Sequence, residues 1–167
     1  SRMVAEYILG DFKEHGEVSE EYLKKSFEEG QKLLMEEQEK QNRALEMKTT
    51  LVVLLADGNS VRWGHIGDSR LYYFKNRKLA QRTLDHSVPQ MLVTAGEIRE
   101  EDIRGHADRN RLLRVMGSEW DQPRYKLAEP LRPEGKEAFL LCSDGFWEWV
   151  DEKAMQSALK KADSPSE

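Results

Sequence analysis

The chain has 167 residues, 38% hydrophobic and 34% charged, which is enough for one domain with a real core and does not require a second. Its net charge of −5 argues against nucleic acid as a partner. No stretch approaches membrane-spanning length, and the single cysteine, Cys142, excludes an internal disulfide. We therefore expect a cytoplasmic protein with no membrane partner.

The first part of the chain predicts two helices. Apolar residues between 2 and 14 recur at helical spacing. Ser19 is a candidate N-cap for a second helix, with acidic residues in its first turn. From Glu36 to Arg43 the sequence is almost wholly polar, so we expect the helix to fray there or become a loop. This charged run could be a docking surface, but a solvated face is the favoured interpretation.

From Thr49 the pattern becomes that of β-structure. Residues 49–56 are continuous, β-branched and apolar, as in a strand covered on both sides. Asp57-Gly58-Asn59 is a strong hairpin turn. Three further strands are predicted, and short polar connections suggest that all four strands form an antiparallel meander: residues 60–67, 71–74 and 78–84.

The remainder of the chain mixes short helices and strands. Ser87 can cap a helix over 88–94 with Pro89 in its first turn, and Asp151 can cap a final helix over 151–161. Four segments between these helices are also assigned: short helical pieces within 97–109, a further helical turn at 112–116, an exposed strand at 125–128 and a strand at 138–142 buried on both faces. These patterns predict an α+β fold.

Two aspartates follow predicted strands at the point where each strand turns. Asp68 comes after the strand that ends at Gly67, and Asp144 comes after the apolar run that ends at Cys142. Carboxylates at neighbouring strand ends can hold Mg²⁺ or Mn²⁺, which prefer oxygen ligands. A lone aspartate at such a corner most often caps the backbone, so spacing alone leaves both interpretations open.

The residue strings around these aspartates resemble a known family. Residues 64–72, Gly-His-Ile-Gly-Asp-Ser-Arg-Leu-Tyr, resemble the glycine-aspartate-serine-arginine motif of the metal-dependent 2C-type serine/threonine protein phosphatases. Residues 141–148 resemble the family's cysteine-serine-aspartate-glycine motif. Four further segments match in the family's order, so the resemblance covers residues 45–160: 47–51 at the first central strand, and 84–87, 95–98 and 109–112 in the flap of its bacterial members.

The resemblance implies a fold and an activity. The fold would be two antiparallel β-sheets packed as a sandwich and flanked by helices. The reaction would be hydrolysis of phosphoserine or phosphothreonine in proteins phosphorylated by Ser/Thr kinases, by a water that bridges two Mn²⁺ or Mg²⁺ ions. By position, Asp144 would be a ligand of the binuclear centre. Asp68, together with Asp144, would help to hold a third ion.

The sequence also departs from the family pattern. The earlier aspartate-glycine segment and the closing aspartate-asparagine motif, both of which supply metal ligands, are absent. We therefore interpret residues 1–167 as a single, truncated catalytic domain. The alternative is a catalytically silent homologue or fragment that acts as a binding or regulatory module, and a purely structural scaffold is a third possibility. The oligomeric state and the conformation of the flap, about residues 85–117, are left open.

The cysteine and the histidines receive structural assignments. Cys142 has no arginine six positions later, where Glu148 stands instead, so it is interpreted as a small buried hydrophobe and not as a nucleophile. The four histidines show no paired metal-ligand spacing. We expect His65 to pack in the core and His86 to stabilise the local structure of the flap.

Overall fold

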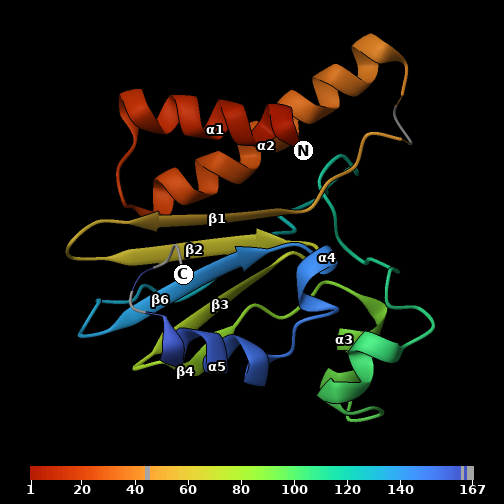
Figure 1. The fold of residues 1–167 in the computed structure, drawn as a ribbon. Coiled ribbons are helices and arrows are strands. Elements are labelled where there is room, and N and C mark those ends of the chain that lie inside the picture. Colours follow the sequence, from red (N-terminus) through yellow and green to blue (C-terminus); the bar gives the residue numbers. More distant parts are fainter. Residues whose placement is uncertain (44–45, 163, 165–167) are drawn as a thin grey trace.

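The protein is a sandwich of two antiparallel sheets with helices on both outer faces (Figure 1). The computed structural model describes residues 1–43, 46–162 and 164. Residue 45, where the family resemblance begins, lies outside the described residues. Within the described part, no helix is both long enough and apolar enough to cross a membrane. The predicted α+β sandwich is confirmed.

Two antiparallel helices cover the outer face of the first sheet. Helix α1 spans Arg2–His15 and helix α2 spans Glu20–Gln41. The predicted cap is present, because Ser19 accepts a hydrogen bond from the backbone N–H of Tyr22 at 3.0 Å. The expected fraying after residue 36 is wrong. Gln38 is buried inside this polar run and donates to the backbone carbonyls of Met47 and Gly117, which extends the helix over the core.

The first sheet has the strand order β1-β2-β5: β1 (Leu51–Ala56), β2 (Val61–Ile66) and β5 (Lys126–Leu127). Side chains alternate along β1, as the period of a strand requires. Leu51, Val53 and Leu55 face the helices α1 and α2. Val52 and Leu54 pack between the sheets. The prediction of a strand covered on both sides is confirmed here.

The second sheet has the strand order β4-β3-β6: β4 (Lys78–Arg82), β3 (Arg70–Lys75) and β6 (Glu137–Cys142). The predicted four-strand meander is therefore wrong at one connection. Strands β2 and β3 lie in different sheets, and residues 67–69 carry the chain across. Leu71 and Tyr73 fill the space between the sheets, while Tyr72 and Phe74 face outward against helices.

Strand β6 is less buried than its apolar sequence suggested. It lies at an edge of the second sheet and pairs with β3 alone among the described strands. Its residues are mostly half-buried, and Leu141 is 41% exposed. Ala138, Leu140 and Cys142 pack under the C-terminal helices and Phe139 packs between the sheets. Because the open edge of the strand admits solvent, the predicted burial is only partial.

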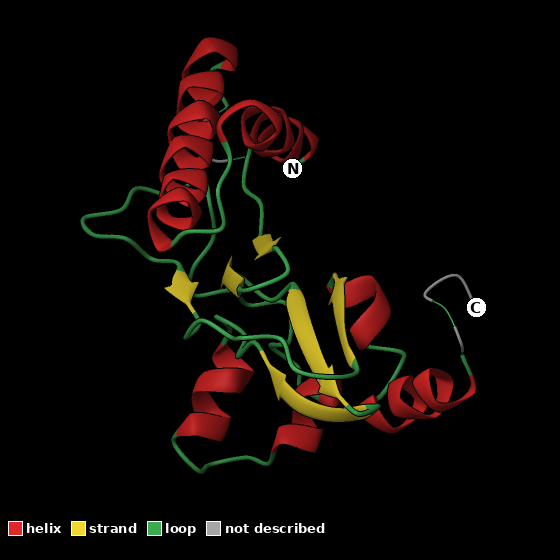
Figure 2. Cartoon of the chain, turned by 90° about the vertical axis from the view of Figure 1, so that its left-hand side faces the viewer, coloured by secondary structure: helices red, strands yellow, loops and turns green. Residues whose placement is uncertain are grey.

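The flap and the C-terminal helices cover the outer face of the second sheet (Figure 2). These elements are α3 (Val88–Thr94), the 3₁₀ helix η1 (Glu100–Gly105), α4 (Asp144–Trp147) and α5 (Glu152–Lys161). The caps predicted at Ser87 and Asp151 are present. Residues 112–116 do not form the expected helical turn; Leu112 and Met116 make isolated bridges to Ser87 and Thr49 instead.

Candidate metal centre

Asp68 lies in the tight turn that carries the chain from the first sheet to the second. Gly67 immediately before it has a φ of +100°, a conformation that L-residues rarely adopt. A Cβ at this position would also clash with the side chain of Thr50. Glycine is therefore required for the turn, and the turn places Asp68 in a buried position with 7% of its surface exposed.

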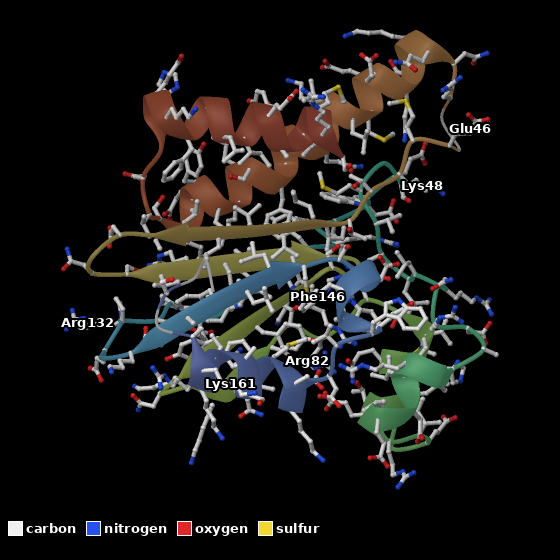
Figure 3. The ribbon with its side chains drawn as sticks, in the orientation of Figure 1. Glu46, Lys48, Arg82, Arg132, Phe146 and Lys161 are labelled. Carbon is white, nitrogen blue, oxygen red and sulfur yellow. The ribbon has the colours of Figure 1, made fainter. Side chains whose placement is uncertain are left out.

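Asp144 is the first residue of α4, directly after strand β6. It is exposed, and its carboxylate accepts a hydrogen bond from the N–H of Gly145 at 2.8 Å. Figure 3 shows Phe146 on this short helix, close to the end of β6. The second predicted ligand therefore stands at the surface, where a cation can reach it.

The fold brings the two aspartates close enough for their charges to interact. Burial and, to a smaller extent, the negative charges of Asp144 and Asp85 together raise the pKa of Asp68 to about 6. Such a raised pKa means that the ionised carboxylate lacks sufficient positive charge nearby. A bound divalent cation would supply that charge, so the two carboxylates fit a site for Mg²⁺ or Mn²⁺.

These two carboxylates make only part of a metal site. Over residues 1–43, 46–162 and 164, no three histidine, cysteine, aspartate or glutamate side chains are grouped so that they could hold a metal ion. The absence of the two further ligand motifs in the sequence is consistent with this geometry. Asp85, the third nearby carboxylate, is committed to a different partner.

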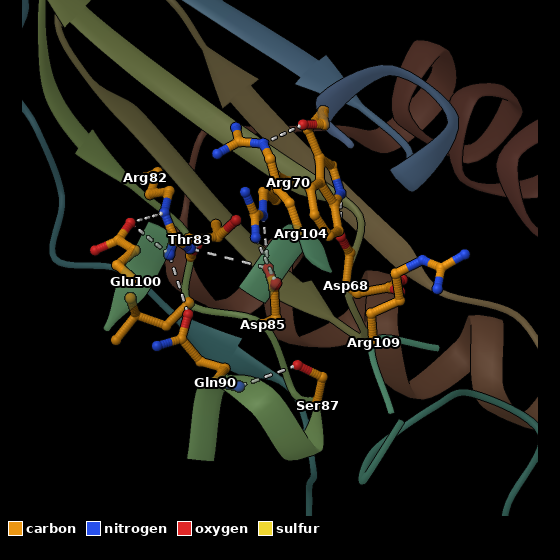
Figure 4. Close-up of polar contacts among 12 residues, drawn as sticks. Asp68, Arg70, Arg82, Thr83, Asp85, Ser87, Gln90, Glu100, Arg104 and Arg109 are labelled. Carbon is orange, nitrogen blue, oxygen red and sulfur yellow. Dashed lines mark hydrogen bonds and ion pairs between the residues drawn. The ribbon is translucent and has the colours of Figure 1, made fainter. Parts of the chain in front are cut away.

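Asp85 forms a buried ion pair with Arg70 beneath the two corners (Figure 4). The carboxylate accepts from Nε at 2.8 Å and from Nη2 at 2.7 Å, and the two side chains are 1% and 2% exposed. Arg70 also donates to the hydroxyl of Tyr72 at 3.0 Å. A bidentate pair of this kind fixes the orientation of both partners.

Trp147 connects this ion pair to the two aspartate corners, which are the turn at residues 67–69 that carries Asp68 and the start of α4 at Asp144. Its indole Nε1–H donates to the backbone carbonyl of Asp68 at 2.9 Å. The guanidinium carbon of Arg70 lies 3.5 Å from the ring centre of Trp147, a cation–π arrangement. Because Trp147 closes the helix that begins at Asp144, one side chain joins the two corners.

The flap contacts the same helix. Arg104 of η1 donates through Nε to the carbonyl of Trp147 at 2.9 Å and pairs with Glu152 of α5 at 3.0 Å. Arg109 lies 3.3 Å from the carboxylate of Glu148. Two arginines therefore attach the flap to the segment that carries Asp144.

His65 and His86 have the structural roles predicted for them, whereas Cys142, predicted to be buried, is half-buried against an apolar cluster. His65 is buried, bonds to the carbonyl of Leu84 and stacks on His86 at 4.6 Å. His86 accepts from the N–H of Gly67 through Nδ1, which supports the turn before Asp68. Burial raises the pKa of the Cys142 thiol to about 11, so it is not an activated nucleophile.

A cavity of about 720 Å³ opens beside this histidine pair. It lies between β2, the end of β4 and helix α3, and apolar side chains such as Trp63 and Met91 form part of its wall. Arg114 and Lys126 are exposed at its lining. The cavity therefore has a cationic rim close to the flap.

Sequence reasoning assigned Asp68 and Asp144 but missed the residues that hold them. Arg70, Asp85 and Trp147 enter the sequence analysis only as parts of motif strings. The available signal was the position of Arg70 in the string that contains Asp68, since an arginine in an otherwise apolar strand needs a buried partner. Its partner lies 15 residues away, a separation that no local pattern indicates.

The α+β fold and the two aspartate corners are those expected of a phosphatase domain. Comparison with known proteins supports this class. Residues 1–164 match protein phosphatase 2C. The serine/threonine phosphatase stp of Listeria welshimeri is 35% identical over 148 residues, which cover 89% of this chain and 58% of the relative. The chain belongs to the protein phosphatase 2C family, and its relatives include bacterial serine/threonine phosphatases.

Solved structures show the same fold. The serine/threonine phosphatase Stp1 of Staphylococcus aureus superposes with a TM-score of 0.87 at 26% identity, covering 99% of this chain and 66% of that one. The catalytic domain of the phosphatase PstP, solved with two manganese ions, gives a TM-score of 0.78 at 24% identity, covering 97% of this chain and 69% of that one. The chain spans about three fifths of the length of the Listeria relative.

Proposed function

We propose that the protein hydrolyses phosphoserine and phosphothreonine in phosphoproteins, in the cytoplasm and in opposition to Ser/Thr kinases. The observation that supports this most directly is the joining of Asp68 and Asp144 through Trp147, in the order and fold of the family. Named relatives are serine/threonine phosphatases, and the PstP structure contains manganese.

In this proposal Asp144 and Asp68 are metal ligands. The exposed carboxylate of Asp144 is a ligand of the two-ion centre, and the buried carboxylate of Asp68 helps Asp144 to hold a third, more weakly bound ion. When bound, Mn²⁺ or Mg²⁺ ions supply an activated water near neutral pH and offset charge on the phosphoryl oxygens. The chain's own contribution is to fix both carboxylates in place through the buried network around Trp147.

The experiment is phosphate release from a phosphothreonine peptide with and without Mn²⁺, using the naturally expressed polypeptide that carries this sequence. We expect release that requires Mn²⁺ and is lost in Asp144→Asn, which keeps the size of the side chain but removes its charge. Asp151→Asn is a matched control, because Asp151 caps α5 and an asparagine side chain caps a helix equally well. Full activity in Asp144→Asn would refute the metal assignment.

The alternative function, a silent homologue that binds a partner, gives a different result in the same assay. Wild-type protein would then release no phosphate at any Mn²⁺ concentration. No observation in the structure favours this alternative over hydrolysis.

A further inference from the structure

We propose that Trp147 is a positioning residue that sets the separation of Asp68 and Asp144 and links it to the flap. Among the described residues, Trp147 is connected to both aspartate corners. Its backbone belongs to the single-turn helix that begins with Asp144, and its indole bonds the backbone of Asp68. A shift of the indole would therefore move one aspartate corner relative to the other.

The hydrogen bond to Asp68 is buried and directional. Trp147 is 1% exposed, and its Nε1–H meets the Asp68 carbonyl at 2.9 Å. A buried carbonyl that loses its donor has no water to replace it. His86 restrains the Gly67 side of the turn through two hydrogen bonds, and the bond from Trp147 restrains the backbone at Asp68 itself.

Trp147 is held by one arginine at its ring and by another at its backbone. Arg70 stacks on its ring at 3.5 Å and is fixed by two hydrogen bonds to Asp85. Arg104 bonds the backbone carbonyl of Trp147 and pairs with Glu152. Figure 4 shows Arg70, Asp85 and Arg104 near Asp68.

The same contacts connect the metal corner to the flap. Asp85 begins the flap, and Arg104 lies in its 3₁₀ helix η1. Asp85 acts on Trp147 through Arg70, which stacks on the indole, and Arg104 bonds the backbone carbonyl of Trp147 directly. Displacement of the flap would therefore reach both aspartates through Trp147, in addition to the direct bonds between His86 of the flap and Gly67 beside Asp68.

The test is Trp147→Phe, which keeps an aromatic ring for Arg70 to stack on and removes only the N–H donor and part of the ring. Trp149→Phe is the matched control, because Trp149 lies two residues away and is 84% exposed. Two quantities are measured on the naturally expressed polypeptide: amide hydrogen exchange in the metal-free protein and the dissociation constant for Mn²⁺. Thermal unfolding is recorded in parallel.

We expect Trp147→Phe to speed exchange of the Gly67 and His86 amides. The Gly67 N–H donates to Nδ1 of His86, and the His86 N–H donates to the Gly67 carbonyl, so both report on the turn. We also expect an approximately fivefold weaker affinity for Mn²⁺, the factor that corresponds to a lost hydrogen bond. Trp149→Phe should change neither quantity. Arg104→Gln should act in the same direction with a smaller effect, and it serves as the second variant if Trp147→Phe does not fold.

Unchanged exchange at Gly67 and His86 in a folded Trp147→Phe protein would overturn the positioning role. A fall in thermal stability alone, with both other quantities at the control value, would reduce Trp147 to a packing residue and would also overturn it. The inference rests on the proposed function only for the Mn²⁺ measurement. Wild-type protein that binds no Mn²⁺ would refute the proposed metal site, and the exchange rates would then decide the positioning role by themselves.

Discussion

The two helix-covered faces of the sandwich are stabilised in different ways. The face under α1 and α2 is an apolar cluster that includes Leu23, Phe27 and Val53. The face under α4, α5 and the flap has a smaller apolar cluster and a buried network of charged side chains around Arg70 and Asp85. Apolar contacts tolerate small shifts, whereas hydrogen-bonded charges require one geometry. The face with the stricter geometry is the one that holds both candidate ligands.

The largest expected effect follows from breaking the ion pair on the polar face. Asp85→Ala leaves the Arg70 guanidinium buried without its two hydrogen bonds, and we expect a loss of about 3–5 kcal/mol in the free energy of unfolding. Urea denaturation measures it. Glu6→Ala is the control, because Glu6 pairs with Arg2 at the surface and such pairs contribute about 0–1 kcal/mol.

A double variant sharpens this result. Arg70→Met combined with Asp85→Leu removes both charges together, so we expect it to cost less than Asp85→Ala alone. If Asp85→Ala proved as stable as Glu6→Ala, the network would not be the stabilising feature of its face.

A substitution in the apolar face should lower the free energy of unfolding and leave the affinity for Mn²⁺ unchanged. Leu23→Ala removes a side chain that is 2% exposed from the cluster under α1 and α2, and a cost of about 3 kcal/mol is expected. At temperatures where the variant remains folded, its Mn²⁺ affinity should equal that of wild type. Leu9→Ala, at a 62% exposed position, should leave both quantities unchanged. A weakened Mn²⁺ affinity in folded Leu23→Ala would remove the distinction between the two faces.

The smallest expected effect concerns the neutral histidine pair beside the polar network. Burial and the charges of His65, Arg114 and Lys126 lower the pKa of His86 to about 3, against an ordinary value near 6.5. The unfolded chain therefore binds a proton that the folded chain does not. The contribution of His86 to the free energy of unfolding is therefore fully present above pH 6.5 and is lost as the pH drops from 6.5 towards 3.

The size of this effect can be isolated by comparison with a variant. Allowing for partial exposure, His86 should account for about 1 kcal/mol of stability lost between pH 7 and pH 5. His86→Gln has no proton to bind, so its stability should decline less steeply over this range in denaturant titrations at each pH. Parallel curves for wild type and variant would contradict the lowered pKa.

The sequence predicted those parts of the fold that depend on neighbouring residues. Caps at Ser19, Ser87 and Asp151 were identified because a capping side chain bonds an N–H only three residues ahead. The alternation of the first strand was equally local. Pairings between distant segments were not predictable in this way: β3 pairs with β6, more than 60 residues further along the chain.

In the candidate site, too, the sequence indicated the residues that lie in local motifs but not their distant partners. The positions of Asp68 and Asp144 followed from motif strings, and their role as metal ligands stays a prediction. Their supporting residues could not be found, since Trp147 and Asp68 are separated by 79 residues. The error at residues 36–43 has a similar cause, because Gln38 bonds the carbonyl of Met47 and also that of Gly117, 79 residues away.

The hairpin between β3 and β4 has a consequence for the mechanics of the domain. Asn76 and Arg77 at its tip both have positive φ angles, where glycine would be the easier choice at the second position. The Arg77 side chain reaches the carbonyl of Lys160 at 3.2 Å, near the C-terminal end of α5, whereas Glu152 at the other end bonds Arg104 and Tyr72. Helix α5 is thus restrained at both ends by side-chain hydrogen bonds, at one end to the β3–β4 hairpin and at the other to the flap.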